Sequence, residues 1–585
     1  MTARTFAAFL FWLALPAAGA QTTPTPTPAP KPAAGDEAKP AVRETPPDQK
    51  AYTDALKITE PEKKIEALQK MKKDFPDSVY AGIVDSAVFG TLVEKMPDQK
   101  DRILKTAKAM YADAVSKDKA ASKENVIVTT ATRGNTANSI ANQLLGGGIL
   151  LKDASGYAHK GVDSMRENVW IAERREALAK RKQKIPPQEE LAKSFAEARA
   201  ARLATLGRVE LKLGKTKDAQ KLLEESYAVT QSNLNVTAAL GELAVKAGDD
   251  TKAMDYLVAA RLSGRAPDTA NQAFETLYKK GHNGTLDGLE AMLDKEYAKR
   301  FPNPVHVAAY KPGEKRSDRM VLAEVFTGSG CPPCAGADIA FDAAMERYAR
   351  KDLAVVMYHV HIPRPDPMTT NETTARSKNY GVSGVPTFAI DGKKTVGGGS
   401  RDMAPGVFER FQKDLETDLE APSEAKVKID AGINGGTVKV SALVDGVKSE
   451  STDLKVQILL VEKEIRHLGE NGVRFHPMVV RGFGGEKGEG YAIKANGSGT
   501  FEASFDTEAM GKEIRKQLDE YEAKGHRGEK FTFSAKKDQI NRADLAVVVF
   551  VQDDKTKHVL QAAYVDLGTP ATARPTTDAN GNNPQ

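Results

Sequence analysis

Hydrophobic residues recur at two different spacings along the chain, and the change of spacing divides it into three parts. From residue 49 to 303 the apolar residues fall at helical spacing, and Ala, Lys, Leu and Glu are abundant. From 312 to 421 strand-like and helix-like runs alternate, and from 425 to 568 short β-rich runs predominate. Because these spacings distinguish helices from strands, the sequence predicts a multidomain protein with an α-helical domain, an α/β domain and a mostly antiparallel β-sandwich.

The helical part contains a repeat. Leu206-Gly207 recurs as Leu240-Gly241, and the same shift of 34 residues (206 to 240) relates Gly214 to Gly248, Ala219 to Ala253 and Leu223 to Leu257. These positions resemble the tetratricopeptide repeat, in which small residues let paired helices approach each other. Only one weaker copy, at 61–76, accompanies them, so an irregular helical domain is the alternative. Repeats of this kind bind peptides or proteins, and we expect a protein ligand for them.

The middle part predicts a βαβ unit followed by a ββα unit. The expected elements are a strand at 320–327, a helix at 332–350, a strand at 353–362, a short helix at 373–380, a strand at 387–390, a turn at Asp391-Gly392, and a helix carrying Phe408, Phe411, Leu415 and Leu419. An α/β arrangement of this kind places functional residues near the carboxyl ends of its strands.

The C-terminal part predicts strands separated by turn residues, with one helix at 507–524. The expected strands are 427–429, 438–444, 454–461, 501–505, 530–534, 545–552 and 559–565. The histidines of this part, His467, His476, His526 and His558, are scattered along it. We therefore expect a binding or structural module there, without a catalytic constellation.

Both ends of the chain have the composition of processed or unfolded segments. Residues 1–20 carry Arg4, an apolar run of about ten residues and the small-residue ending Ala18-Gly19-Ala20, which is typical of a cleaved signal peptide. A Pro/Thr/Ala-rich linker at 21–48 and a polar tail at 569–585 are expected to be disordered. An extracytoplasmic protein is predicted, in a bacterial periplasm or secreted, with no membrane span after signal cleavage.

Composition narrows the chemistry that the chain can carry. The net charge is +5, from 84 basic and 79 acidic residues mixed along the chain, so a nucleic-acid partner is not expected. Only two of the 585 residues are cysteines, Cys331 and Cys334. A structural zinc site needs about four ligands, so neither a metal site nor a cofactor is predicted.

The two cysteines form a Cys-x-x-Cys at the end of the strand-like run at 320–327. On the chain-entropy model, closing so small a ring stabilises a protein by only about 2 kcal/mol, which makes a structural staple a poor explanation. Reversible oxidation explains the spacing better. An exposed Cys331 at a helix N-terminus attacks as a thiolate, and Cys334, one turn later, resolves the mixed disulfide.

The pair Cys331-Pro332-Pro333-Cys334 and Gly384-Val385-Pro386-Thr387 resembles the active site of the thioredoxin superfamily over roughly 110 of the 585 residues. The resemblance implies that Pro386 follows a cis peptide and packs against the dithiol. It also implies that Val385 and Gly384 contact the substrate chain. Ser329-Gly330 stands where that family usually has a tryptophan before the first cysteine, so the substrate groove is expected to differ.

Three residues are candidates for proton transfer to the dithiol. Glu324 lies one position before the site of the family's buried acid, and a strand-edge carboxylate is the alternative reading. His359 and His361 share one face of the second strand, and partly exposed strand-end histidines are the alternative for both. A metal site built from these histidines would need further acidic or His partners, for which Asp366, in the following Pro-rich loop, is the nearest candidate.

The sequence therefore predicts an exported thiol-disulfide oxidoreductase that exchanges disulfides with protein thiol or disulfide substrates and with an upstream redox partner. Its direction depends on its reduction potential, which the sequence does not fix. The alternative is a non-enzymatic extracytoplasmic protein-binding scaffold with a vestigial thioredoxin-like module. An inaccessible Cys331 or a trans peptide before Pro386 would favour this alternative.

Overall fold

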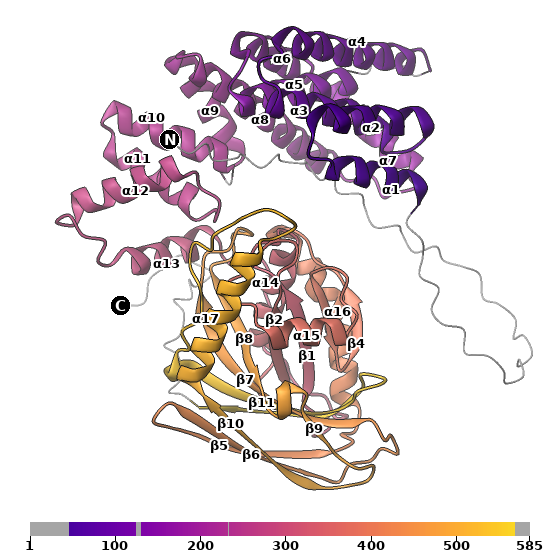
Figure 1. Ribbon diagram of the computed structural model, residues 1–585, viewed down its shortest axis with the longest axis vertical. Helices are drawn as coiled ribbons and strands as arrows, with labels where there is room; N and C mark the ends of the chain where they lie inside the picture. The colour runs from indigo at the N-terminus through magenta and orange to yellow at the C-terminus, as the bar shows by residue number, and fades with distance from the viewer. Residues whose placement is uncertain (1–45, 125–129, 232, 568–585) are drawn as a thin grey trace, which may run out of the picture. The chain divides into compact units, whose positions relative to one another are not determined.

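The computed structural model describes residues 46–124, 130–231 and 233–567. The predicted signal peptide, most of the predicted linker and the predicted tail lie outside these residues. The chain divides into two compact units, Met1–Gly248 and Asp249–Gln585. Helices fill the described part of the first unit, and a mixed sheet with flanking helices fills the second (Figure 1). The sequence predicted this succession of a helical region and a sheet-containing region.

The first unit consists of ten helices in its described residues. They are α1 (Pro47–Lys57), α2 (Pro61–Asp74), α3 (Ala81–Lys95), α4 (Lys100–Glu124), α5 (Ala131–Gly147), α6 (Leu151–Asp163), α7 (Glu167–Lys180), α8 (Gln188–Lys212), α9 (Thr216–Val229) and α10 (Leu234–Ala247). Their apolar faces share a core that includes Leu68, Phe89, Ile140 and Leu206. Amphipathic helices are stabilised mainly by this kind of mutual burial.

The first copy of the predicted repeat folds as the helix pair α8–α9. Gly214 has φ +81°, a conformation that suits glycine, and lies in the turn between the two helices. A Cβ atom at Gly207 would lie 2.8 Å from Leu223 Cγ, so glycine at this position permits the close approach of α9. The structure shows this helix pair, but it does not confirm a tetratricopeptide family.

The second unit begins with α11 (Asp250–Arg261), α12 (Asp268–Gly281) and α13 (Leu289–Arg300). The predicted helical domain ended at residue 303, whereas these last three helices cluster with the sheet. Buried Arg474 explains part of this difference, since it forms ion pairs with Asp294 at 2.7 Å and Glu290 at 2.6 Å on α13. Helical periodicity does not reveal which neighbour a helix packs against.

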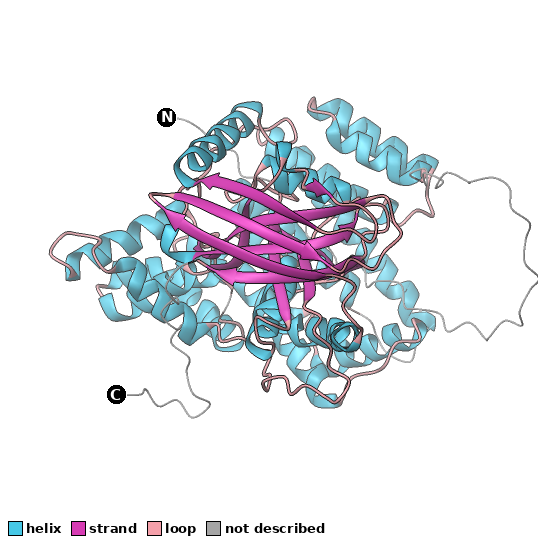
Figure 2. Cartoon of the chain, turned by 90° about the horizontal axis from the view of Figure 1, so that it is seen from below, coloured by secondary structure: helices cyan, strands magenta, loops and turns pink. Residues whose placement is uncertain are grey.

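A nine-stranded mixed sheet forms the centre of the second unit (Figure 2). Its order is β12 (Val559–Asp566), β11 (Leu545–Asp553), β7 (Leu454–Arg466), β8 (Phe475–Phe483), β2 (Leu353–His359), β1 (Val321–Thr327), β3 (Thr387–Ile390) and β4 (Lys393–Val396), with β9 (Tyr491–Ala492) paired to β7. The pairs β1–β2 and β2–β8 are parallel. The predicted α/β and β-sandwich segments thus contribute to one continuous sheet.

A second, three-stranded sheet is formed by β10 (Gly499–Asp506), β6 (Thr437–Asp445) and β5 (Lys426–Asn434). Alternate residues of β7 and β11 face two different cores. Ile458 and Val549 pack with the three-stranded sheet, whereas Leu459 and Phe550 belong to the core shared with β1 and β2. This double burial explains why both strands read as continuous hydrophobic runs.

Four further helices complete the second unit. These are α14 (Cys334–Arg347), α15 (Asn371–Asn379), α16 (Ala404–Glu420) and α17 (Thr507–Lys524). Successive residues of β1 point to opposite faces of the sheet. Thr327 bonds to Asp338 on α14, while Glu324 bonds to Arg376 on α15, so α14 and α15 cover opposite faces of β1.

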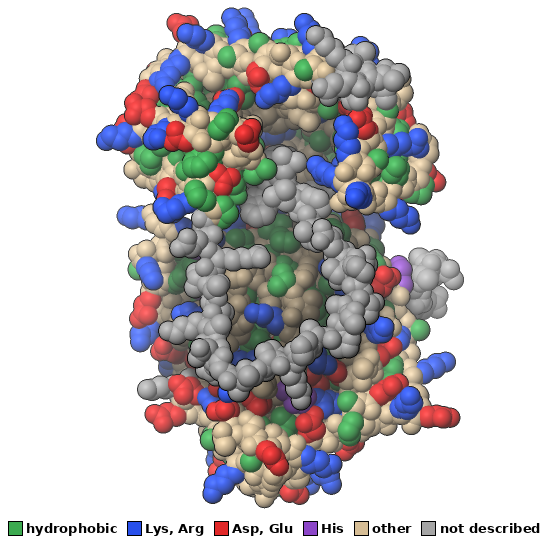
Figure 3. All heavy atoms as spheres, turned by 90° about the vertical axis from the view of Figure 1, so that its right-hand side faces the viewer, with side chains coloured by type: hydrophobic (Ala, Val, Ile, Leu, Met, Phe, Trp, Pro, Cys, Tyr) green, Lys and Arg blue, Asp and Glu red, His purple; other side chains and the backbone are tan. Residues whose placement is uncertain are grey.

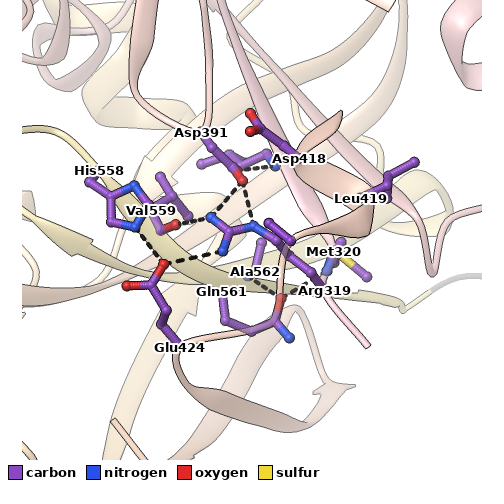
Figure 4. A network of polar contacts seen from close by, with 12 residues as sticks. Arg319, Met320, Asp391, Asp418, Leu419, Glu424, His558, Val559, Gln561 and Ala562 are labelled. Carbon is purple, nitrogen blue, oxygen red and sulfur yellow. Dashed lines mark hydrogen bonds and ion pairs between the residues drawn. The ribbon is translucent and has the colours of Figure 1, made fainter. Parts of the chain in front are cut away.

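An ion-pair network centred on buried Arg319 and Asp391 links segments on both sides of the predicted domain boundary at 421–425 (Figure 4). The Arg319 Nε atom donates to Asp391 Oδ2 at 2.8 Å, and its Nη2 donates to the Val559 carbonyl at 2.5 Å. His558 Nε2 lies 2.7 Å from Glu424 Oε1, which also lies 3.4 Å from Arg319 Nη1. The buried pair Arg319–Asp391 and the partly exposed pair Glu424–His558 therefore link segments on both sides of the boundary.

Charged side chains of both signs are interspersed over the face drawn in Figure 3. The whole sequence carries nearly equal numbers of basic and acidic residues, 84 and 79. The described helices include none that is both long and apolar enough to cross a membrane.

Candidate functional site

Cys331 and Cys334 are joined by a disulfide, with their Cα atoms 5.3 Å apart. Cys334 is the first residue of α14, and Cys331 lies in the turn between β1 and that helix. The Cys334 amide donates to the Cys331 carbonyl at 3.0 Å, which closes the turn. The helix thus begins later than the predicted residue 332, and Cys331 lies before the N-cap, which is Pro333.

Of the segment Gly384-Val385-Pro386, the structure places Val385 beside the disulfide. The Val385–Pro386 peptide is cis, and Cys331 Sγ lies 3.5 Å from the Val385 carbonyl oxygen. The Gly384 carbonyl accepts a bond from Thr387 Oγ1 at 2.8 Å. A Cβ atom at Gly398 would lie 2.3 Å from both the Pro333 carbonyl oxygen and Pro386 Cγ, so this glycine permits the close packing.

Cys331 is only 1% exposed, whereas the sequence predicted an exposed attacking sulfur. The loop between β7 and β8 covers the turn that carries it. The Asn471 amide donates to the Ser329 carbonyl at 2.9 Å, and the Arg364 side chain packs against Gly330. Arg364 and Glu470 form an ion pair at 3.0 Å. These covering residues come from segments distant in sequence, so local pattern could not reveal them.

Asp366 binds the same turn through its buried carboxylate. Its carboxylate accepts bonds from the Ser329 amide at 2.6 Å and the Met368 amide at 2.8 Å, and lies 3.0 Å from His359 Nδ1. Burial alone would raise the pKa of Asp366, but His359 and these amides outweigh it and hold the pKa below its usual range. Asp366 is therefore an ionised anchor for the turn before Cys331.

His361 has a different role from the predicted one. Its Nδ1 accepts the backbone amide of Asp366 at 3.0 Å, and its ring stacks on Tyr521 with the centroids 3.6 Å apart. Burial lowers the pKa of His361 to about 4, so it is neutral near pH 7. His359 and His361 both act on Asp366, one on its carboxylate and the other on its backbone.

Three of the histidines described as scattered gather around this region. The rings of His476 and His359 lie 5.1 Å apart, and those of His467 and His476 lie 6.0 Å apart. His526 Nε2 lies 2.8 Å from the Pro363 carbonyl. The parallel pairing of β8 with β2 brings His476 and His467 there. These three histidines are scattered in the sequence but lie close to the segment 359–363, and the pairing that brings His467 and His476 there joins segments more than a hundred residues apart.

Buried Glu324 does not serve the disulfide. Its Oε1 accepts from Arg376 Nη2 at 2.7 Å and from Tyr358 Oη at 2.9 Å, and its Oε2 accepts from Tyr380. Gln552 closes the network through Arg376 and Tyr380. Glu324 lies on the face of β1 that α15 covers, which is not the position expected for proton transfer to the dithiol. It is not a strand-edge carboxylate either, because β1 lies between β2 and β3 in the sheet.

A carboxyl that the sequence prediction missed, Asp338, lies on the face of β1 that carries α14. It is 4% exposed and lies one turn after Cys334, and its Oδ1 accepts from Thr327 Oγ1 at 2.7 Å. Within the described chain, its Oδ2 has no hydrogen-bond partner. Burial raises the pKa of Asp338 to about 7 against the opposing bond from Thr327.

The chemistry of these groups fits electron and proton exchange at sulfur. The described residues contain no group of three or more His, Cys, Asp and Glu side chains that could hold a metal ion. What they do contain is a disulfide, a carbonyl oxygen beside Cys331, an ionised Asp366 beneath the turn and a buried acid on the helix that Cys334 begins.

Comparison with known proteins gives one match. The family described as Outer membrane protein Omp28 matches residues 373–570, about a third of the chain. The match includes Val385, Pro386 and the β7–β8 loop, but both cysteines lie before it. Its description points to an extracytoplasmic location in the cell envelope. No curated protein matches the chain.

This match corrects the family resemblance drawn from the sequence. The matching family is Omp28 and not the thioredoxin superfamily, to which no family match leads. The Cys-Pro-Pro-Cys and Gly-Val-Pro-Thr motifs are only eight residues together, and short motifs of this kind recur in unrelated sequences. The disulfide site is therefore interpreted from its own geometry.

Proposed function

We propose that this protein exchanges disulfides with protein thiols through Cys331 and Cys334, outside the cytoplasm. The observation that carries the proposal is the disulfide itself, which joins the two cysteines of the chain across only three positions. So small a ring adds about 2 kcal/mol to stability on the chain-entropy model, which is little reason to retain it as a staple. The same small ring suits a pair that opens and closes reversibly.

The surroundings of Cys331 support an exchange reaction. The Val385 carbonyl, 3.5 Å from Cys331 Sγ, can accept a hydrogen bond from the thiol when the disulfide is reduced. In exchange, a partner thiolate attacks Cys331 Sγ, Cys334 leaves as a thiolate, and a second partner thiol releases Cys331. The partner dithiol is oxidised to a disulfide and the protein is reduced; run backwards, the same steps reduce a partner disulfide.

The other regions of the chain are proposed to bring partners to this site. The helical unit offers surfaces for a protein ligand, and an upstream redox partner would reset the cysteine pair. The Omp28 match supports an envelope location, for which we propose the periplasm or the outer membrane facing it.

The burial of Cys331 favours a second candidate, a binding scaffold with a closed disulfide. A sulfur that is 1% exposed cannot be reached by a protein thiolate unless its cover moves. In the scaffold, the disulfide fixes the turn between β1 and α14 and takes no part in exchange.

The two candidates are separated by measuring exchange of the full chain with a disulfide-bonded peptide and its equilibrium with glutathione. The oxidoreductase exchanges with the peptide and has a measurable potential, which sets its direction. Cys331→Ser and Cys334→Ser are the controls and should both abolish turnover. Absence of exchange, together with a disulfide that resists excess glutathione, would support the scaffold.

A further inference from the structure

The helix that begins at Cys334 carries a buried acid on the same face. Asp338 lies four residues after Cys334, and residues four apart on a helix are neighbours, with Cβ atoms about 5–6 Å apart. Cys334 is 0% exposed and Asp338 is 4% exposed. Both side chains are therefore buried on one face of α14, and the Asp338 side chain reaches Thr327 at the end of β1.

Asp338 has an oxygen to spare. Its Oδ1 accepts from Thr327 Oγ1 at 2.7 Å, but its Oδ2, within the described chain, makes no hydrogen bond. A buried polar atom without a partner costs free energy and is uncommon in folded proteins. In a protein that opens its disulfide, such an atom can find its partner in the reduced state.

Opening the disulfide produces a buried thiolate that requires a proton, and Asp338 can supply one. When a thiolate attacks Cys331 Sγ, the electron pair of the broken bond goes to Cys334, whose sulfur is fully buried. A thiolate in such surroundings is costly, so it should take up a proton. The other buried acids nearby are committed, Glu324 to Arg376 and Asp366 to two amides and His359.

We propose that Asp338 exchanges a proton with the Cys334 sulfur during opening and closing of the disulfide. This inference rests on the proposed function. On opening, the bond from the partner sulfur to Cys331 forms, the Cys331–Cys334 bond breaks, and the carboxyl proton passes from Asp338 to Cys334. On closing, the Cys334 thiol returns its proton to the Asp338 carboxylate and attacks the mixed disulfide, which releases the partner thiolate.

The groups around Asp338 determine the pH at which it can act. Burial raises its pKa to about 7, the bond from Thr327 and the electrostatic effect of nearby His359 on β2 oppose this, and Asp366 and Asp342 add to it. An acid with a pKa near 7 is matched to proton transfer at neutral pH. Below that pH Asp338 can donate, and above it the donor is lost.

The test is the pH dependence of disulfide opening in Asp338→Asn, a variant of nearly equal size that cannot donate as an acid. The full chain is reduced by dithiothreitol between pH 5.5 and 8.5, quenched by alkylation, and the rate is divided by the concentration of dithiothreitol thiolate. For the unchanged protein this rate should fall by roughly tenfold or more through about pH 7, since a general acid typically contributes at least that factor. For Asp338→Asn it should be low and flat, and the two proteins should agree above about pH 8.

Two further variants keep the test decisive. Asp342→Asn changes a carboxyl one turn further along α14 and should keep the fall in rate, moved only slightly in pH. Thr327→Val removes the bond that lowers the pKa of Asp338 and should move the fall to higher pH. It also supplies an answer if Asp338→Asn does not fold.

The inference is overturned if Asp338→Asn, or Thr327→Val in its place, shows the same profile as the unchanged protein. Such a result would leave the proposed function standing, because peptide exchange is measured separately. Failure of peptide exchange would refute the function, while the dithiothreitol profile would still report whether Asp338 serves Cys334.

Discussion

Glu324 on β1 and Asp338 on α14 are two buried acids that lie at opposite faces of β1, and they differ in how completely they are paired. Both oxygens of Glu324 accept bonds, from Arg376, Tyr358 and Tyr380. Asp338 has a single partner, Thr327, for one of its oxygens. Burial would lower the pKa of Arg376, yet Glu324 and the two tyrosines raise it above its usual range. No charged partner of this kind faces Asp338 at hydrogen-bond distance in the described residues.

The difference teaches which buried acid is structural and which is available for chemistry. A carboxylate with a full set of hydrogen-bond partners, as Glu324 is, holds β1, α15 and β11 together. A carboxyl with a spare oxygen and a pKa near 7 can change its protonation with little rearrangement. β1 thus separates Glu324, whose hydrogen bonds hold the fold together, from Asp338, which has an unpaired oxygen in the described chain.

The largest expected effect comes from breaking the Glu324 side of this comparison. Glu324→Gln leaves Arg376 buried without a counter-charge and should lower the free energy of unfolding by about 3–5 kcal/mol, measured by denaturant titration. Disulfide reduction per folded molecule should change by no more than about twofold. Adding Arg376→Met should recover part of the loss. A large change in the pH profile of reduction would show that the two faces are coupled.

Asp338→Asn should have the opposite effect on stability, and only at higher pH. Its pKa is about 7 when folded and 3.8 ordinarily, so the folded state binds the extra proton and stability falls as the pH rises from about 4 to 7. The unchanged protein loses about 1.36 kcal/mol of stability for each of the two pH units between 5 and 7, and little more above pH 7. The variant should therefore be about 3 kcal/mol more stable relative to the unchanged protein at pH 8 than at pH 5. Thermal unfolding at both pH values measures this, and an equal effect at pH 5 and 8 would contradict it.

A smaller effect is expected from the disulfide itself. Replacing both Cys331 and Cys334 by serine should cost no more than about 2 kcal/mol, because the ring they close constrains the unfolded chain only slightly. Urea unfolding of the double variant against the oxidised protein gives the value. A loss of about 5 kcal/mol would indicate a structural staple and favour the scaffold.

The smallest effect concerns the cover over Cys331. Arg364 and Glu470 are 51% and 41% exposed, so Glu470→Gln should change stability by less than about 1 kcal/mol. Because this pair holds the β7–β8 loop over the turn, its loss should speed reduction by about two- to fivefold at low salt. The gain should vanish near 1 M salt. Glu513→Gln, at a surface pair on α17, is the matched control. Equal rates at low salt would show that the ion pair does not hold the cover.

Local sequence signals predicted the elements well where capping and periodicity agree. The helix expected at 507–524 is confirmed as α17, and Asp506 caps it by accepting the amides of Glu508 and Ala509. The strand expected at 387–390 is confirmed as β3. In both cases residues close in sequence decide the structure, so the chain can be interpreted segment by segment.

The pairing of strands that are far apart in the sequence could not be predicted from the sequence. The parallel contact of β2 with β8, through Met357 and Val479, fuses two predicted domains into one sheet and gathers the histidines. Nothing within either strand specifies this partner, because both strands are buried on both faces. The cover over Cys331 has the same origin, since the β7–β8 loop reaches the disulfide only through this pairing.

The sequence around Asp338 does contain a pattern that predicts a buried acid. Asp338 is the one charged residue between Cys334 and Phe341, in a run that is otherwise small or apolar. A lone acid in such a run, one turn from a cysteine, indicates a buried carboxyl beside sulfur. The family resemblance pointed instead to Glu324 on the strand, both of whose carboxylate oxygens accept hydrogen bonds.

The most direct test of disulfide exchange is to trap its intermediate. Purified Cys334→Ser and Cys331→Ser proteins are each incubated with a peptide disulfide, and adducts are identified by mass spectrometry after alkylation. If Cys331 is the sulfur that meets partners, Cys334→Ser accumulates a mixed disulfide at Cys331, while Cys331→Ser accumulates little because Cys334 is fully buried. Failure of Cys334→Ser to form an adduct, while the protein stays folded, would contradict the proposed exchange.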